Sequence, residues 1–196
     1  MTTKEKELKQ LTTTISQCSK CTLSTSRNNV VVGSGKITSQ LFFIGEAPGA
    51  QEDKHGIPFV GRAGKLFDTL LNSIDLNRTD VYVANILKCR PPKNRNPKSN
   101  EIQQCTPYLE QQLKIIQPSI ISPMGNFATK YCCKKFSKEF HNISSLHGQN
   151  FPISINSKPG YLIPLYHPAA AVYNPNLVDA MKKDYILIKK LLINFE

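Results

Sequence analysis

The feature that most constrains the fold is a regular alternation of short apolar runs with segments of helical period. The apolar runs cover residues 41–44, 81–84, 119–122 and 161–165. Between them, apolar residues recur at spacings of three and four, which is typical of helices that pack one face on a sheet. Because strands that alternate with helices pair in parallel, the sequence predicts an α/β protein with a mostly parallel sheet covered on both faces.

The remaining elements fit the same plan within one domain. Helices are predicted at residues 4–17, 63–74, 99–116, 125–136 and 176–193. A short strand is expected at residues 30–32, and short antiparallel strands are expected within residues 137–160. No internal repeat or long linker divides the sequence, so we expect a single domain over residues 1–196.

Composition limits the class of partner and the compartment. The 196 residues carry a formal net charge of +11, which favours an anionic partner such as nucleic acid. The sequence has no apolar run long enough to cross a bilayer and no signal peptide at its start, so we expect an intracellular, cytoplasmic protein with no membrane partner. Thiols stay reduced there, so the six cysteines suggest metal or cluster ligation more than disulfides.

Four of the cysteines form two spaced pairs. Cys18 and Cys21 are separated by two residues, and Cys89 and Cys105 are separated by fifteen. Two such pairs can converge beside one sheet, and four thiolates suit zinc or an iron–sulfur cluster. Cys105 also fits the apolar face of its predicted helix, where a free cysteine is often simply buried. The adjacent cysteines 132–133 point about 100° apart on a helix, so we interpret them as packing residues.

Polar and aromatic residues follow three of the predicted parallel strands. Residues 45–49 come after the first strand, Asn85 follows the second, and His167 follows the last. Folds of this class bind ligands at the carboxyl edge of the sheet. A carboxamide, an imidazole, the Glu46 carboxylate and the Phe59 ring could together recognise a flat heterocycle. Each residue alone is more typical of a turn or surface loop, and their shared edge is what favours a site.

Four motifs carry a resemblance to a known family. They are G-E-A-P-G-x-x-E-D at 45–53, P-F-V-G-R-A-G at 58–64, N-I-L-K-C-R-P-P-K-N-R at 85–95 and H-P-A-A at 167–170. In their length and order they resemble the family 4 uracil-DNA glycosylases. The spacing of the four cysteines is also similar to that of the family's ligands for a [4Fe-4S] cluster. The resemblance covers nearly the whole chain and is weakest over residues 130–160.

The resemblance implies a three-layer α/β/α sandwich and a DNA repair enzyme. Such an enzyme would hydrolyse the N-glycosidic bond of deoxyuridine, releasing uracil and leaving an abasic site where cytosine had been deaminated. Its partner would be uracil-containing DNA, and the base would have to be flipped out of the duplex to reach the pocket. We expect a monomer, because each lesion needs one site and the sequence shows no heptad pattern.

By matching motif, the resemblance also assigns roles within the pocket. Phe59 would stack on uracil, and Asn85 would hydrogen-bond the imide edge of the base and reject cytosine. His167 would stabilise the negative charge that develops on uracil O2 as the bond breaks. Glu46 would position or polarise the attacking water.

Gly45 and Ala47 are expected beside the bound base, and Ala47 departs from other branches. Those branches place an aspartate where this chain has Ala47. Without that carboxylate, the reaction should depend on leaving-group stabilisation along a dissociative, oxocarbenium-like path. We therefore expect larger contributions from His167 and Asn85 than from Glu46.

The loop over residues 88–98 is strongly basic and is expected to contact DNA phosphates. Its cations are Lys88, Arg90, Lys93, Arg95 and Lys98. The alternative is a solvated surface run. In the segment after His167, the resemblance makes Tyr173 a candidate wedge that enters the duplex as the base leaves.

The resemblance makes Cys18, Cys21, Cys89 and Cys105 the ligands of a [4Fe-4S] cluster. Cys89 lies inside the basic loop. Our hypothesis is therefore that the cluster is structural and pins this loop to the N-terminal segment and to the helix over residues 99–116. A redox role is the alternative.

Three other functions stay open at this point. An iron–sulfur protein for electron transfer would explain the cysteines but not Asn85, His167 and Phe59 at one edge. A nucleic-acid-binding module with structural zinc would explain the charge and the cysteines but not the glutamate-bearing loop. A glycosylase for another deaminated base would share the site, although Asn85 argues for uracil.

Overall fold

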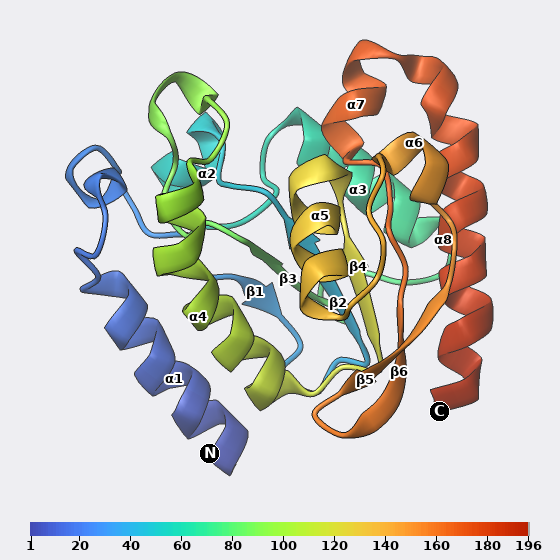
Figure 1. Cartoon of the computed structure of the whole chain (residues 1–196), viewed down its shortest axis with the longest axis horizontal. Coiled ribbons are helices and arrows are strands. Elements are labelled where there is room, and N and C mark those ends of the chain that lie inside the picture. The colour runs from blue at the N-terminus through green and yellow to red at the C-terminus, as the bar shows by residue number, and fades with distance from the viewer. Residues whose placement is uncertain (196) are drawn as a thin grey trace.

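The protein is built around one sheet with helices on both faces (Figure 1). The computed structural model describes residues 1–195. The strands are β1 (Ser34–Gly35), β2 (Leu41–Gly45), β3 (Tyr82–Asn85), β4 (Ile120–Pro123), β5 (Phe151–Ile155) and β6 (Lys158–Leu162). Their order across the sheet is β1-β3-β2-β4-β6-β5. The four central strands run parallel, and the edge strands β1 and β5 pair antiparallel.

Helices connect the strands and cover the sheet. They are α1 (Thr3–Ser16), α2 (Ala50–His55), α3 (Arg62–Asn72), α4 (Ser99–Ile116), α5 (Gly125–Lys135), α6 (Ile143–Leu146), α7 (Pro168–Tyr173) and α8 (Val178–Leu192). α4 and α5 cover one face and α3 and α8 cover the other, while α1 packs along α4 (Figure 1). Within residues 1–195, no helix is long and apolar enough to span a membrane.

Strand β2 shows why the sheet needs cover on both faces. Every residue of this strand is buried, as expected for a central parallel strand. Phe42 and Ile44 pack into the core beneath α4 and α5. Leu41 and Phe43 point the other way and pack beneath α3 and α8. The predicted three-layer α/β/α arrangement is therefore confirmed.

Most of the predicted elements are confirmed. The helix expected at residues 99–116 is α4 with the same bounds, and the antiparallel strands expected within residues 137–160 include β5, which forms a hairpin with β6. The cysteines 132–133 are fully buried in the core, as predicted for packing residues. The prediction of a strand at residues 30–32 is wrong. There Val31 donates its N–H to the Lys88 carbonyl at 2.8 Å, and the first strand begins only at Ser34.

The strand order brings several loops to one edge. β2 lies between β3 and β4, so the chain leaves β2 towards one side of the sheet and then returns to the other side. Connections that diverge in this way leave a crevice at the carboxyl ends of the strands. The loops after β2 and β3 and the turn after β6 therefore surround a common space.

Candidate active site

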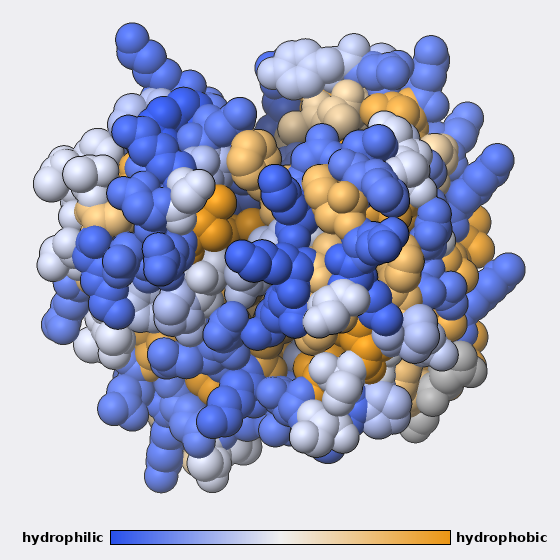
Figure 2. Space-filling model, viewed as in Figure 1, coloured by the Kyte–Doolittle hydropathy of each residue, from blue (hydrophilic) through white to orange (hydrophobic). Residues whose placement is uncertain are grey.

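A cleft opens at the carboxyl edge of the sheet, where the sequence predicts a site. Its volume is about 390 Å³, within the range of small-ligand pockets. The predicted residues that line it are Glu46, Ala47, Phe59, Asn85, Arg95 and His167. Figure 2 shows the outline of the molecule notched along this edge, between the loop after β3 and α7.

Asn85 borders this cleft with an unpaired amide oxygen. It is the last residue of β3 and is 2% exposed. Among the described residues, its Oδ1 has no hydrogen-bond partner. Gly45 makes room for this atom, because a Cβ atom at that position would lie 2.2 Å from Oδ1. A buried carbonyl oxygen without a partner is costly, so the arrangement favours an N–H donor supplied by a ligand.

The Phe59 ring forms a wall of the cleft. Its centroid lies 5.5 Å from that of the His167 ring, and the two planes differ by 28°. Behind it, Phe67 of α3 packs with a centroid distance of 5.4 Å. The Phe59 backbone has a φ of +56°, a left-handed conformation that residues other than glycine seldom adopt. The ring therefore depends on its surroundings to stay in this position.

His167 is the N-cap residue of α7, which begins with a proline that needs no N–H partner. The Ala169 N–H donates to His167 Nδ1 at 3.1 Å, which leaves the ring proton on Nε2. Burial lowers the pKa of His167 to about 4, and the nearby Glu52 only partly opposes this effect. The imidazole is therefore neutral at pH 7 and keeps Nε2–H as a hydrogen-bond donor.

Glu46 supplies a carboxyl group directly after β2. Burial raises the pKa of this carboxyl group above its ordinary value. The Glu46 carbonyl accepts the N–H of Leu87 at 3.0 Å, which ties this loop to the segment after β3. The neighbouring Ala47 contributes no acid group, so the first turn of this loop offers a single carboxylate to the cleft.

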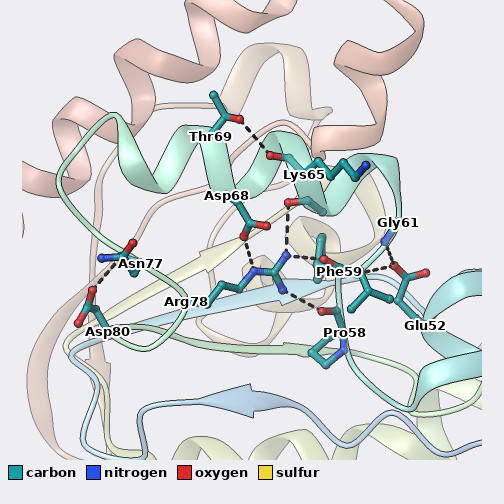
Figure 3. A network of polar contacts seen from close by, with 12 residues as sticks. Glu52, Pro58, Phe59, Gly61, Lys65, Asp68, Thr69, Asn77, Arg78 and Asp80 are labelled. Carbon is teal, nitrogen blue, oxygen red and sulfur yellow. Dashed lines mark hydrogen bonds and ion pairs between the residues drawn. The ribbon is translucent and has the colours of Figure 1, made fainter.

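Glu52 has a role that sequence reasoning missed. Its carboxylate accepts the N–H of Gly49 at 3.1 Å, and those of Val60 and Gly61 at 2.9 Å each. The bonds from Val60 and Gly61 join the start of α2 to the loop that carries Phe59, and Figure 3 shows Glu52 facing Gly61. Glu52 lies three residues after Gly49, which is the spacing of a capping box at the start of a helix. This spacing was the signal available in the sequence.

The four spaced cysteines converge on a second, smaller cavity. Cys18 and Cys21 line it from the segment after α1, Cys89 from the loop after β3, and Cys105 from α4. Within residues 1–195, no three His, Cys, Asp or Glu side chains are placed to hold a single metal ion. A four-iron cluster is larger than one ion and holds its thiolates further apart. The convergence of four soft ligands on one cavity fits such a group.

Hydrogen-bond donors surround two of these thiols. Arg27 donates to Cys89 Sγ, and the Lys88 N–H donates to Cys105 Sγ, each at 3.2 Å. Burial raises the pKa of Cys105 to about 11, and burial also raises the pKa of Cys89. Both thiols would lose their protons when a metal centre binds, and the donors would then stabilise the thiolates.

Comparison with known proteins identifies the family. The family model for the uracil DNA glycosylase superfamily matches residues 32–188. The type-4 uracil-DNA glycosylase of Sulfurisphaera tokodaii is 42% identical over 95% of this chain and 85% of its own length. The chain belongs to the type-4 uracil-DNA glycosylases. Those of Archaeoglobus fulgidus and Thermotoga maritima are 42% and 38% identical, over 90% and 89% of this chain and 89% and 88% of theirs. The resemblance stated from the motifs is confirmed.

In this type-4 glycosylase, the predicted contact of Lys88 with DNA is wrong. The residue is 1% exposed, and its ammonium donates to the Asn85 carbonyl at 2.8 Å and to Gln112 Oε1 at 2.6 Å. Burial lowers the pKa of Lys88 to about 8, although Cys105 opposes the shift. The side chain points inward because it links the end of β3 to α4, so it cannot reach a phosphate.

The other predicted DNA contacts of the glycosylase lie at the surface. Lys93 is exposed, and Arg90 and Arg95 are partly exposed. Arg95 also forms a bidentate ion pair with the buried Glu101, which holds it at the cleft. Tyr173, at the end of α7, is 84% exposed. It ends the short helix whose N-cap residue is His167, so it lies on the same segment as that pocket residue.

Proposed function

We propose that this protein is a DNA repair enzyme that hydrolyses the N-glycosidic bond of deoxyuridine in DNA. The products would be free uracil and an abasic site, the first intermediate in base excision repair of deaminated cytosine. The observation that carries this proposal is the buried, unpaired Asn85 Oδ1 in a cleft with Phe59 and His167. The type-4 uracil-DNA glycosylase relatives support it.

The cleft would read uracil by its shape and its imide edge. The base would be flipped out of the duplex and would stack on the Phe59 ring. Asn85 Oδ1 would accept the N3–H of uracil, and the Asn85 amide N–H would donate to O4. Cytosine has a lone pair at N3 and an amine at C4, so both contacts would be unfavourable. Gly45 and Ala47 would lie against the base without crowding it.

The chemistry would rest on stabilising the departing uracil. As the glycosidic bond breaks, negative charge develops on the base, and His167 would donate its Nε2–H to uracil O2. The neutral imidazole keeps this donor on Nε2 because its Nδ1 accepts the Ala169 N–H. Glu46 would position the water that attacks the sugar, and its carboxylate would favour the positive charge on the sugar ring. Ala47 offers no second carboxylate, so a dissociative path is favoured.

Protonation of His167 is not expected to limit the reaction near neutral pH. Its pKa lies near 4 instead of 6.5, so the neutral donor form persists as the pH falls from about 8 to about 5. The test measures the pH dependence of the rate in the Glu46→Gln variant. Glu46 is replaced because its carboxyl group would itself titrate at acidic pH and would hide the effect of His167. The single-turnover rate of this variant should be constant over that range. A fall in rate centred on pH 6.5 would contradict this account of His167.

The activity itself is tested with a single-stranded oligonucleotide that contains one deoxyuridine. After incubation, alkali should cleave the strand at that position only, and the matched strand with thymidine should stay intact. The second candidate function is an iron–sulfur nucleic-acid-binding or redox protein without glycosylase activity, which the cysteine cavity alone would support. An intact deoxyuridine strand, after incubation with protein whose iron content is full, would favour that candidate.

We propose that Arg90, Lys93 and Arg95 contact DNA phosphates and that Tyr173 enters the duplex beside the flipped nucleotide. Affinity for DNA would then fall as salt rises, because each phosphate contact releases condensed counterions. A monomer is sufficient for this function, because all the proposed pocket residues come from one chain. The substrate implies that the enzyme acts inside the cell, with the DNA.

We propose further that Cys18, Cys21, Cys89 and Cys105 bind a [4Fe-4S] cluster. When bound, the cluster would supply a rigid connection between segments that are far apart in the sequence. It would hold the segment after α1, the basic loop and α4 together. The negative charge of the Cys105 thiolate would then act on the buried Lys88 ammonium and offset part of the cost of burying a cation.

Replacing Cys105 with serine is expected to remove iron and sulfide and to lower the melting temperature by several degrees. The reason is that serine is a poor ligand for iron, so the remaining three cysteines would not retain the cluster that holds the segments together. Cys132→Ala is the matched control, since Cys132 is a buried cysteine of α5 that packs in the core and does not line the cysteine cavity. This control should lose stability without losing iron. Native stability and native activity in Cys105→Ser would contradict the structural role.

A further inference from the structure

The backbone at Phe59 is in a conformation that the rest of the structure must maintain. Its φ of +56° is left-handed, and a side chain as large as phenylalanine disfavours that region. Such conformations persist where surrounding contacts determine them, and they gather at functional sites. Glu52 holds one side of this loop through the N–H groups of Val60 and Gly61. The carbonyl groups of the loop need a second partner.

Arg78 is that partner (Figure 3). It comes from the segment between α3 and β3, and its guanidinium donates to the Pro58 carbonyl at 2.9 Å, to the Phe59 carbonyl, and to the Gly64 carbonyl at 3.3 Å. Its Nε also donates to Asp68 of α3, which orients the guanidinium group. One side chain therefore binds three carbonyl groups along the path that leads from Phe59 into α3.

The loop that carries Phe59 lies very close to the first turn of α3. A Cβ atom at Gly64 would lie 1.8 Å from the Phe59 carbonyl oxygen, so only glycine lets the first turn of α3 meet this carbonyl. The Arg78 guanidinium also lies over the Phe67 ring, 5.0 Å from its centroid, and Phe67 packs against the Phe59 ring. Arg78 thus supports both the backbone and the ring of Phe59.

The geometry points to Arg78 as a positioning residue that holds Phe59 in place for stacking on the flipped base, and that acts on uracil release only through Phe59. This inference rests on the proposed function. A planar guanidinium is needed, because a lysine ammonium cannot bind three carbonyl groups and a carboxylate in one plane. Arg78 is not expected to touch the DNA, so it should affect the chemical step more than the binding of substrate.

A double-mutant cycle tests this inference with the full-length, iron-loaded protein. Arg78→Met is expected to lower the single-turnover rate of uracil release by about 10- to 100-fold, with a change of less than about threefold in the Kd for the oligonucleotide. Arg78→Lys should restore little. Phe59→Leu should also be slow, and adding Arg78→Met to it should cost less than about threefold more, because the ring that Arg78 positions is already gone.

Controls separate this effect from a loss of folding and from failure of the proposed function. Lys189→Met removes a different ion pair near the end of α3, formed with the exposed Asp75, and should leave the rate unchanged. Melting temperature and iron content are measured for each variant, and Arg78→Gln replaces Arg78→Met if the latter does not fold. Equal rate losses from Arg78→Met with and without Phe59 would overturn the inference. Absence of uracil release by the wild-type protein would instead overturn the proposed function.

Discussion

Replacing His167 with alanine is expected to slow single-turnover release of uracil by about 100- to 1000-fold. The reason is that Nε2–H is a donor placed for the charge that develops on the departing base, and its Nδ1 is already occupied by the Ala169 N–H. Binding of the oligonucleotide should change much less, because the ground-state base carries little charge. The measurement is single-turnover cleavage at saturating enzyme, with a separate titration for the Kd.

The matched variant for this prediction is His167→Asn. Asparagine is a favoured N-cap residue, so it can still accept the Ala169 N–H and preserve the start of α7, yet it is too short to replace the Nε2 donor. Its melting temperature should stay closer to that of the wild type than the value for His167→Ala, and its rate should be equally low. A large increase in Kd with an unchanged single-turnover rate would show that His167 serves binding alone.

Replacing Asn85 with alanine is expected to lower the rate of uracil release by about 100-fold or more. The reason is that the pocket loses the polar group that would bind the imide edge of uracil. The melting temperature of this variant should not fall with its activity. The Asn85 Oδ1 atom is buried and, among the described residues, unpaired, so removing it should leave the melting temperature unchanged or raise it. Loss of activity without loss of stability would indicate that Asn85 serves ligand binding and does not stabilise the fold.

Gly45→Ala gives a second test of the pocket around this contact. The added methyl group would lie 2.2 Å from Asn85 Oδ1 and 2.8 Å from Phe59 Cζ, so it would displace both the amide and the ring without removing either. We expect a rate loss comparable to that of Asn85→Ala, measured with the same deoxyuridine strand. If Asn85→Ala retained most of the wild-type rate, the pocket would not read uracil through this amide.

Local patterns were enough to predict the fold and the edge of the sheet that carries the site. The period of α4 and the apolar run of β2 reflect the packing of each element on the core, so both are visible in the sequence. The gathering of Asn85 and His167 followed from parallel strand order. By contrast, α7 escaped prediction because a helix of six residues shows less than two turns of any period.

Sequence reasoning misplaced or missed features that depend on distant partners. Lys88 lies within a basic run, and nothing local distinguishes it from its exposed neighbours, yet it turns inward because Gln112 and the Asn85 carbonyl accept from it. Arg78 binds carbonyl groups up to 20 residues away, and no spacing rule reports such contacts. Phe59 was predicted at the pocket and does line the cleft, but its left-handed backbone was not predicted, because it follows from these same distant bonds.

The account holds that catalysis comes mainly from stabilising the departing uracil and less from activating water. The most direct test compares the single-turnover rates of Glu46→Gln and His167→Ala on the same single-stranded deoxyuridine substrate at neutral pH. We predict that His167→Ala loses more of the wild-type rate than Glu46→Gln, because Ala47 places no second carboxylate beside Glu46 and we propose a dissociative path. A far larger loss in Glu46→Gln would contradict the account and would make Glu46 an obligatory general base.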